Sequence, residues 1–282
     1  MSSSGSGQKA SARPRPDPLG WDFEDIPTPV LQCPPVQYLP RNSKGNDLVI
    51  GDVHGQRATF ERMLDEVGYS PERGDRILLL GDVIDRGPDS PGMLSWLQRD
   101  GVYCIRGNHE QLMIESLDGN KLMEELWVGH NGGGWASDLG PGALEDWRHA
   151  LNSLPVALEV DVPQGKMVLV HAEVSETTPW WATREWLEEG DRTALIRSIW
   201  SKSRVWNRPE RDAGVPDVWR TFHGHVALKK FINVGNMRWI DRGAGHANSY
   251  DGAALACVVI EPEGTERAPV LVRVRDVETR YT

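Results

Sequence analysis

Three short polar motifs carry the residue types that could do chemistry, and each one follows an apolar run. The motifs are Gly51-Asp52-Val53-His54-Gly55, Gly81-Asp82-Val83-Ile84-Asp85-Arg86-Gly87 and Gly107-Asn108-His109-Glu110. The apolar runs before them are typical of buried strands. In open α/β sheets, ligands bind beyond the carboxyl ends of the strands. We therefore expect the three motifs to meet at one site, although they are dispersed along the chain.

The polar residues of these motifs are typical metal ligands. Asp52 and His54 lie two residues apart, a spacing that can direct both side chains at one ion, and the carboxylate of Asp82 could bridge two ions. His171 follows a further apolar run, and His225 follows a glycine. Oxygen and imidazole ligands together suit Mn, Fe or Zn, and two ions about 3.5–4 Å apart form the usual clamp for in-line attack at phosphorus. The candidate ligands are Asp52, His54, Asp82, Asn108, His171 and His225.

The elements that must position these residues alternate in the first half of the chain. Apolar runs predict strands, and apolar residues at helical spacing predict helices. We expect Ser90 to cap the second helix, ahead of a first-turn proline. The resulting βαβαβα order is typical of a parallel sheet with helical crossovers. Strands are expected at 48–50, 77–80 and 102–105, then at 167–170, 231–234, 237–240, 254–260 and 270–274, and helices at 60–67, 93–97 and 112–117.

Composition narrows the class of protein. The 282 residues include 41 acidic and 31 basic side chains, a balance that argues against general binding to nucleic acid. The three cysteines are far apart and form no CxxC pair, which suits a reducing cytosol, so we expect a cytoplasmic location. The longest apolar run, residues 253–260, is far shorter than the roughly 20 residues that cross a bilayer, and no membrane association is expected.

The order of the motifs resembles the PPP-family metallophosphatase pattern over roughly residues 47–245. Within this family, the residues that follow the second motif (87–90) and the stretch 127–135 are most similar to those of the lambda-phage and bacterial Prp phosphatases. The resemblance implies a four-layer α/β metallophosphoesterase fold, with two mixed β-sheets between helices. It is carried by Asp52-x-His54, Asp82-x-x-Asp85-Arg86, Asn108-His109-Glu110, His171-Ala172 and Gly224-His225.

The resemblance also implies the cofactors and the catalytic roles. Two divalent ions are expected, Mn²⁺ first, with Fe or Zn as alternatives, and a hydroxide that bridges them would attack phosphorus. His109 would protonate the leaving oxygen, Asp85 would orient His109, and Arg86 would bind two phosphate oxygens. The first ion would be held by Asp52, His54 and Asp82, and the second by Asp82, Asn108, His171 and His225.

A second phosphate-binding residue is ambiguous. The lambda-like enzymes carry an arginine two residues after a tryptophan in this part of the chain, whereas here Trp200 is followed by Lys202 at that spacing and by Arg204 two residues later. A guanidinium fits two phosphate oxygens better than an ammonium does. We therefore expect Arg204 to contact phosphate and Lys202 to be the alternative.

The expected activity is hydrolysis of phosphate monoesters, as in a serine/threonine protein phosphatase that acts on a phosphoprotein or a small phosphate ester. A symmetrical dinucleoside tetraphosphate hydrolase is the first alternative, and Arg86 beside Asp85, with Glu110 after His109, favours the protein phosphatase. An inactive phosphate-binding scaffold is the second alternative. The retention of all six candidate ligands argues against a scaffold.

The resemblance to this family does not extend to the N-terminal segment, to which we assign no counterpart. Residues 1–20 are rich in Ser, Gly, Pro and Arg and are expected to be disordered. Residues 21–45 contain repeated prolines and are expected to lie extended on the domain. We therefore divide the chain into a disordered or extended segment, residues 1–45, and a metallophosphoesterase domain, residues 46–282.

Two further features allow more than one interpretation. His223 could support His225 from behind, but a purely structural role is the stronger expectation. The segment His130 to Trp135 contains three glycines but lacks the Lys-Ser/Thr of a P-loop. We expect it to be a flexible loop that borders the site.

Overall fold

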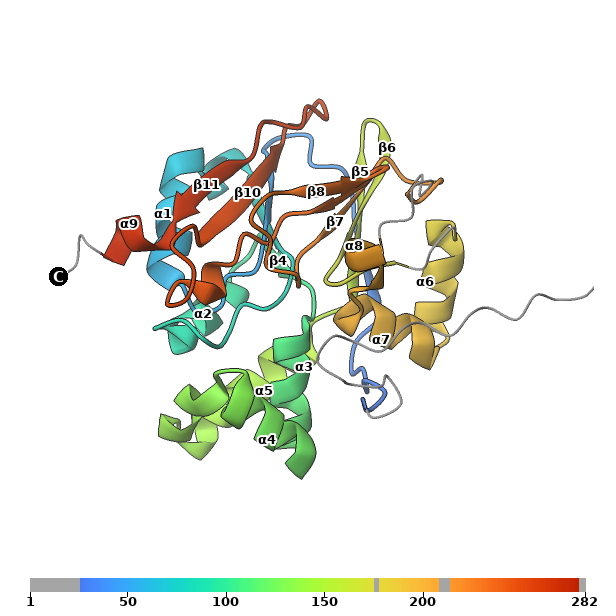
Figure 1. Cartoon of the computed structure of the whole chain (residues 1–282). Helices are drawn as coiled ribbons and strands as arrows, with labels where there is room; N and C mark the ends of the chain where they lie inside the picture. Colours follow the sequence, from blue (N-terminus) through green and yellow to red (C-terminus); the bar gives the residue numbers. More distant parts are fainter. Residues whose placement is uncertain (1–25, 175–177, 208–213, 279–282) are drawn as a thin grey trace, which may run out of the picture.

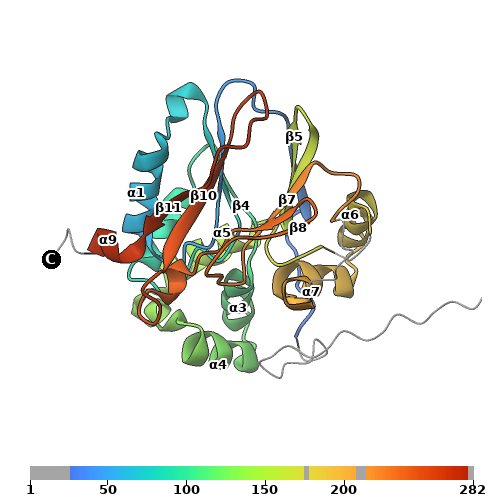
Figure 2. The same cartoon turned by 45° about the horizontal axis from the view of Figure 1, so that its top comes forward.

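A computed structural model of the chain describes residues 26–174, 178–207 and 214–278. Two β-sheets lie against one another at its centre, with helices on their outer sides (Figures 1 and 2). Each sheet contains both parallel and antiparallel pairs, so the expectation of two mixed sheets between helices is confirmed. The prediction of disorder for residues 1–20 falls outside the described residues.

The first sheet has five strands in the order β11-β10-β2-β3-β4. The three strands that precede the motifs are parallel neighbours, and the antiparallel strand β10 extends the sheet beside β2. The predicted βαβαβα unit is therefore present. The strands are β2 (Asp47–Ile50), β3 (Arg76–Leu79), β4 (Val102–Cys104), β10 (Ala254–Ile260) and β11 (Val270–Arg273).

The second sheet has six strands in the order β1-β5-β6-β7-β9-β8. Its strands β6 and β7 run parallel and lead to the two later histidines, His171 and His225. The strands are β1 (Val36–Leu39), β5 (Ala157–Val162), β6 (Gly165–Val170), β7 (Arg220–His223), β8 (Ile232–Val234) and β9 (Met237–Trp239).

Alternating side chains divide the interior into three apolar layers. In β2, Leu48 and Ile50 pack under the outer helices, whereas Val49 packs in the layer between the two sheets. In β6, Met167 and Leu169 face that same central layer. Successive residues of a strand point to opposite faces, so a strand buried on both faces is apolar at every position. This is why the predicted strands appear as continuous apolar runs.

The helices cover the outer faces of the sheets and one end of the molecule. Helices α1, α2 and α9 lie beside the five-stranded sheet, α6 and α7 lie on the side of the six-stranded sheet, and α3 to α5 gather at the end where the motifs lie (Figures 1 and 2). The helices are α1 (Arg57–Val67), α2 (Ser90–Leu97), α3 (Asn108–Leu117), α4 (Lys121–His130), α5 (Pro141–Asn152), α6 (Trp180–Glu188), α7 (Arg192–Trp200), α8 (Ser203–Asn207) and α9 (Val274–Glu278), with 3-10 helices at Pro71–Arg73, Gly133–Asp138 and Ala244–His246.

The cap of α2 differs from the prediction. Asp89 is the N-cap residue, and its carboxylate accepts from the Gly92 N–H at 2.8 Å. The Ser90 hydroxyl instead accepts from the backbone N–H of Asp85 at 2.8 Å. Ser90 therefore stabilises the turn that presents Asp85 and Arg86. The helix cap that we expected at Ser90 lies one residue earlier, at Asp89.

Part of the N-terminal segment belongs to the six-stranded sheet. Strand β1 pairs in parallel with β5, and the Pro35 carbonyl accepts from the N–H groups of Val156 and Ala157. The residues before β1, 26–35, form a strap that crosses toward the motifs. Its carbonyls at Val30 and Ile26 accept from buried or half-buried arginines, Arg106 and Arg192.

Candidate active site

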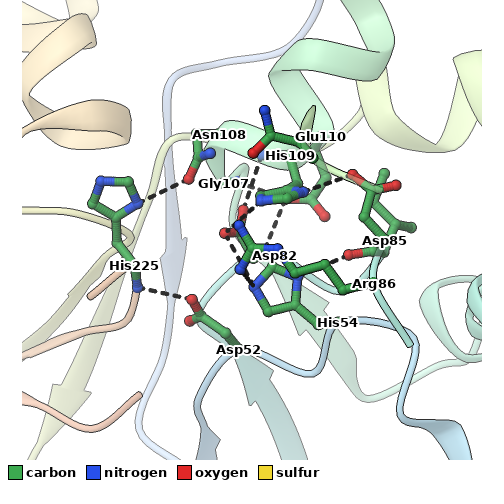
Figure 3. Close-up of polar contacts among 12 residues, drawn as sticks. Asp52, His54, Asp82, Asp85, Arg86, Gly107, Asn108, His109, Glu110 and His225 are labelled. Atoms are coloured by element: carbon green, nitrogen blue, oxygen red, sulfur yellow. Dashed lines mark hydrogen bonds and ion pairs between the residues drawn. The ribbon is translucent and has the colours of Figure 1, made fainter. Parts of the chain in front are cut away.

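The three motifs meet at the carboxyl ends of β2, β3 and β4 (Figure 3). The turns after β2 and β3 are joined directly, because the His54 N–H donates to the Asp82 carbonyl at 2.8 Å and the Gly55 N–H to the Val83 carbonyl at 2.8 Å. The predicted convergence is thus a direct consequence of parallel neighbouring strands.

The backbone at these turns is strained in a consistent way. Among the described residues, the non-glycine residues with φ in the left-handed region are His54 (48°), Asp82 (49°), Asp85 (72°), Arg86 (67°) and His225 (66°). Side chains with a β-carbon seldom adopt this conformation, which costs of order 1–3 kcal/mol and persists only where the surrounding structure imposes it. All five residues are candidates from the sequence, so the fold bends its backbone to aim these side chains.

Two groups of side chains are close enough to bind cations, and both contain Asp82. One group is His54, Asp82 and His109, and the other is Asp82, His171 and His225. Asp82 Oδ2 lies 3.7 Å from His54 Nε2, and Asp82 Oδ1 lies 3.4 Å from His171 Nε2. A carboxylate shared between two groups is the arrangement that a bridging ligand requires.

Asn108 and Asp52 complete the surroundings of the second group. Asn108 Oδ1 lies 3.1 Å from His171 Nε2 and 2.8 Å from His225 Nδ1. Asp52 Oδ2 accepts from the backbone N–H of His225 at 2.9 Å (Figure 3). The six candidate ligands are therefore brought together, although Asp52 is not a member of either group of three.

The imidazole rings are oriented by backbone carbonyls. Nδ1 of His171 lies 2.6 Å from the Leu80 carbonyl, Nδ1 of His54 lies 3.0 Å from the Ile84 carbonyl, and Nε2 of His225 lies 3.0 Å from the Trp200 carbonyl. A carbonyl partner places the proton on the nitrogen that it contacts, so the other nitrogen is left as a ligand atom. For each of the three histidines, that other nitrogen faces the centre of the site.

A buried atom without a hydrogen-bond partner supports a cation at this site. Asp52 Oδ1 is buried and has no hydrogen-bond partner. Burying an unpaired carboxylate oxygen is costly unless a hydrogen bond or a metal satisfies it. The donor set of carboxylate, amide oxygen and imidazole matches Mn, Fe or Zn. The residues present therefore fit divalent metal ions.

Electrostatics point the same way. Burial, followed by the nearby Asp241 carboxylate, raises the pKa of Asp52 well above its ordinary value. Burial also raises the pKa of Asp241 to about 6. Burial by itself lowers the pKa of His171, but the carboxylates of Asp82 and Asp52 outweigh it and raise that pKa to about 10. The site concentrates carboxylates that a divalent cation would neutralise.

His109 is held by a buried carboxylate on the side away from the proposed ions. Its Nδ1 lies 2.6 Å from Asp85 Oδ2, and both side chains are fully buried. Asp85 also accepts from the indole N–H groups of Trp127 at 2.9 Å and Trp135 at 2.7 Å. A carboxylate with three donors is fixed in place and orients the imidazole. The Asp85–His109 pairing that the resemblance implied is thus present.

A cavity of about 450 Å³ opens beside these residues. Its polar end includes Arg86, His109 and Lys202, and its apolar part includes Leu126 of α4 and Ile26 of the strap. Arg86 Nη1 donates to His54 Nε2 at 3.0 Å, so its guanidinium already lies against the candidate metal ligands.

Of the two candidates after Trp200, the structure brings Lys202 to the cavity. Arg204 is fully buried, and its Nη1 donates to the Val174 carbonyl at 3.2 Å. Arg204 is not among the residues that line this cavity in the described part of the chain. The expectation that Arg204 rather than Lys202 faces the phosphate site is therefore not met by this arrangement.

Several side chains hold the site together in ways that were not evident from the sequence. Glu110 accepts from the N–H groups of Asp82, Val83 and Gly107 at 2.8–2.9 Å, and so ties the second motif to the third. The two tryptophans that hold Asp85 were noted only as part of a resemblance. Their eight-residue spacing places one in α4 and one in the following 3-10 helix.

The structure also shows where His223 and the segment 130–135 lie, the two features whose sequence allowed more than one interpretation. His223 lies at the end of β7, with Nδ1 2.8 Å from the Val170 carbonyl, and its ring stacks on Trp239. This is a structural role. The segment 130–135 is the end of α4 and the start of a 3-10 helix, and His130 and Asn131 line the cavity, so the segment borders the site but has regular structure.

Residues 48–255 match the model of the calcineurin-like phosphoesterase family. The chain belongs to this family. This phosphoesterase is 31% identical over 199 residues to serine/threonine-protein phosphatase 1 of Salmonella typhimurium, covering 70% of this chain and 85% of that protein. It is 32% identical over 141 residues to a symmetrical bis(5'-nucleosyl)-tetraphosphatase of Paracidovorax citrulli, covering 49% and 47% of the two chains.

A comparison of structures agrees on the fold. A protein serine/threonine phosphatase from Saccharomyces cerevisiae superposes with a TM-score of 0.56 at 16% identity, covering 86% of this phosphoesterase and 84% of that chain. At such identity the likeness shows the fold alone. The motifs that carried the resemblance lie inside the matched family segment.

Proposed function

We propose that this phosphoesterase is a serine/threonine protein phosphatase that hydrolyses phosphate monoesters. The observation that carries the proposal is the Asp85–His109 pair at 2.6 Å, placed beside two groups of candidate ligands that share Asp82. The identity to serine/threonine-protein phosphatase 1, over most of that protein, supports the choice of substrate class. We also propose a cytoplasmic location, since three free cysteines suit a reducing compartment.

The six candidate ligands would hold two divalent ions, for which we propose Mn²⁺. When bound, such ions lower the pKa of water and offset the negative charge of a phosphate group. Asp82, which the two groups share, would be a ligand of both ions. The ligands are Asp52, His54, Asp82, Asn108, His171 and His225.

His109 is proposed to protonate the leaving oxygen from Nε2. This nitrogen is buried without a partner, while Asp85 accepts from Nδ1. Protonation of the leaving group by a positioned side chain typically accelerates such a reaction by about 10²–10⁴-fold. The Asp85 carboxylate stabilises the positively charged imidazole that donates the proton.

Arg86 and Lys202 are proposed to bind the oxygens of the phosphate. Both line the cavity together with His109. The guanidinium can contact two oxygens through its planar fork, whereas the ammonium acts as a point charge. Arg204 is left with a structural role.

Symmetrical hydrolysis of a dinucleoside tetraphosphate is a second candidate, favoured by the identity to the Paracidovorax citrulli protein. One substrate panel with Mn²⁺ separates the two. It compares kcat/KM for phosphoserine and phosphothreonine peptides, para-nitrophenyl phosphate and diadenosine tetraphosphate. The proposal expects the phosphopeptides to exceed the dinucleotide. A higher kcat/KM for diadenosine tetraphosphate would replace the first candidate by the second.

A further inference from the structure

Glu173 is a buried carboxylate that has no place in the chemistry described above. It lies two residues after His171, where the chain leaves β6, and it is fully buried. Its Oε1 accepts from the Ser201 hydroxyl at 2.5 Å and from the Ser203 hydroxyl at 2.6 Å. Its Oε2 accepts from the backbone N–H of Arg204 at 2.8 Å. One carboxylate thus holds three consecutive parts of a distant segment.

The residue between the two serines is Lys202. The hydroxyls on either side of it are held by the same oxygen of Glu173, and the backbone at Ser201 is extended, with φ −73° and ψ 142°. Neighbouring side chains of an extended chain point to opposite sides. Lys202 is therefore directed away from Glu173, and it lines the cavity that contains Arg86 and His109.

The segment that Glu173 holds also contacts a candidate metal ligand, His225. Trp200, one residue before Ser201, places its carbonyl 3.0 Å from Nε2 of His225. Arg197 of α7 lies 3.3 Å from Glu173 Oε1 and adds an ion pair to the same carboxylate. Four donors, one of them the charged guanidinium of Arg197, make this a well-satisfied buried carboxylate, as a rigid support requires.

We propose that Glu173 is a positioning residue that fixes Lys202 in the cavity and so sets the affinity of the site for phosphate. The inference rests on the proposed function in one respect, the assignment of Lys202 to phosphate binding. Glu173 itself touches neither substrate nor cofactor. Its action passes through the Ser201 and Ser203 hydroxyls to the lysine between them.

A glutamine cannot reproduce these contacts. An amide offers one acceptor oxygen and one NH₂ donor group. If the oxygen faces the two serines, the NH₂ group meets the N–H of Arg204, donor against donor. If the amide is reversed, its NH₂ group can donate to the serine hydroxyls, which also accept hydrogen bonds, but it then lies beside the Arg197 guanidinium and no longer carries the charge that paired with it. Either orientation weakens the hold of this side chain on the segment and so loosens the position of Lys202.

The test measures direct binding of orthophosphate to the Mn²⁺-loaded protein by titration calorimetry. Lys202→Ala should weaken binding by about 10- to 150-fold, the value of one charge-assisted contact. Glu173→Gln should weaken it by about 10-fold or more. In the double variant, Glu173→Gln should add little to the effect of Lys202→Ala, because both changes remove the same contact. Bound manganese, measured by elemental analysis, should stay at the wild-type level.

Glu159→Gln is the matched control. Glu159 is also a buried carboxylate of the six-stranded sheet, and it accepts from the Trp180 indole N–H at 2.6 Å, but it does not line the cavity. This variant should lower the melting temperature without changing phosphate affinity. Ser203→Ala, which keeps Glu173, should weaken phosphate binding in the same direction by a smaller factor, and it remains informative if Glu173→Gln does not fold.

Three results would overturn the inference. They are a folded Glu173→Gln protein with wild-type affinity for orthophosphate, an effect that is fully additive with Lys202→Ala, and a silent Lys202→Ala variant. Binding of orthophosphate requires no turnover, so these outcomes are separate from the substrate panel. A protein that binds phosphate through Lys202 but hydrolyses no phosphopeptide would refute the proposed function and leave the role of Glu173 intact.

Discussion

Replacing Asp85 by asparagine tests the proposed proton donor most directly. The carboxylate accepts from His109 Nδ1 at 2.6 Å and from two indole N–H groups, and it is fully buried. Asparagine keeps the size and can still accept from the tryptophans. It removes the negative charge that stabilises the protonated imidazole. The variant should therefore fold and bind metal but donate a proton poorly.

The size of the effect follows from that single contact. A hydrogen bond to a charged group contributes about 1.5–3 kcal/mol, and its loss costs more in a buried site where no water molecule can replace the missing partner. Losing that stabilisation in the transition state corresponds to a fall in kcat of about 10- to 150-fold. Only the upper limit of this range reaches the about 10²–10⁴-fold that general acid catalysis supplies, so His109 should keep part of its effect without the carboxylate. A phosphoserine peptide, with its basic alkoxide leaving group, should show the full loss.

The assay compares two substrates with different leaving groups. Para-nitrophenolate needs little protonation, so Asp85→Asn should reduce kcat for para-nitrophenyl phosphate by only a few fold. Glu159→Gln, which also removes a buried carboxylate from an indole N–H, serves as the control and should leave both rates unchanged. Equal losses on the two substrates, at unchanged metal content, would refute the assignment of His109 as the acid.

Further predictions concern metal binding, pH and the N-terminal segment. Chelation should abolish phosphatase activity and Mn²⁺ should restore it, and full activity in metal-stripped protein would contradict the two-ion site. The Asp82→Asn variant should retain less manganese than the wild-type protein after dialysis. Asp75 accepts from the N–H groups of Asn46 at 2.7 Å and Ser70 at 2.9 Å, and although burial opposes it, the Arg73 ion pair and these bonds hold the pKa of Asp75 below its ordinary value. A lowered pKa stabilises the fold at pH values above the unfolded value of about 3.8, and this contribution is lost as the pH falls through the lower folded-state pKa. Asp75→Asn should therefore cost about 1.5–3 kcal/mol in urea unfolding at pH 7 and much less only at pH values well below 3.8; an equal cost at both extremes would refute this. Deleting residues 1–20 should leave kcat/KM and melting temperature nearly unchanged, whereas deleting residues 1–35 should lower both, and a silent second deletion would show that the strap is dispensable.

Much of the site was predictable because its ligands follow strands directly. Asp52, Asp82 and Asn108 come two to four residues after β2, β3 and β4, and these strands are visible in the sequence as apolar runs. Parallel pairing then fixes where the motifs meet. The convergence of the three motifs and the first half of the fold were therefore available from local patterns. All six candidate ligands were named in this way.

The remainder depended on contacts that no local pattern records. Strand β1 is four residues long, follows a proline and pairs with a strand about 120 residues later. The choice between Lys202 and Arg204 followed the chemistry of the ligand, whereas the contacts of Arg204 with Glu173 and with the Val174 carbonyl join distant parts of the chain and leave no local pattern. Ser90 has the right type for a cap, yet its hydroxyl is engaged by Asp85. Each of these misses is a tertiary contact overriding a local preference.

The pairing of β1 with β5 has a consequence for where this protein can be cut. The family match begins at residue 48, and we had placed the start of the domain at residue 46, both after β1. A chain shortened to either position would leave the outer side of β5 with a row of unpaired N–H and C=O groups. Such an edge is a template for pairing with another molecule. Removing residues up to 45 would thus replace the short edge strand β1 by the longer and more deeply buried strand β5, and we expect the shortened chain to aggregate more readily.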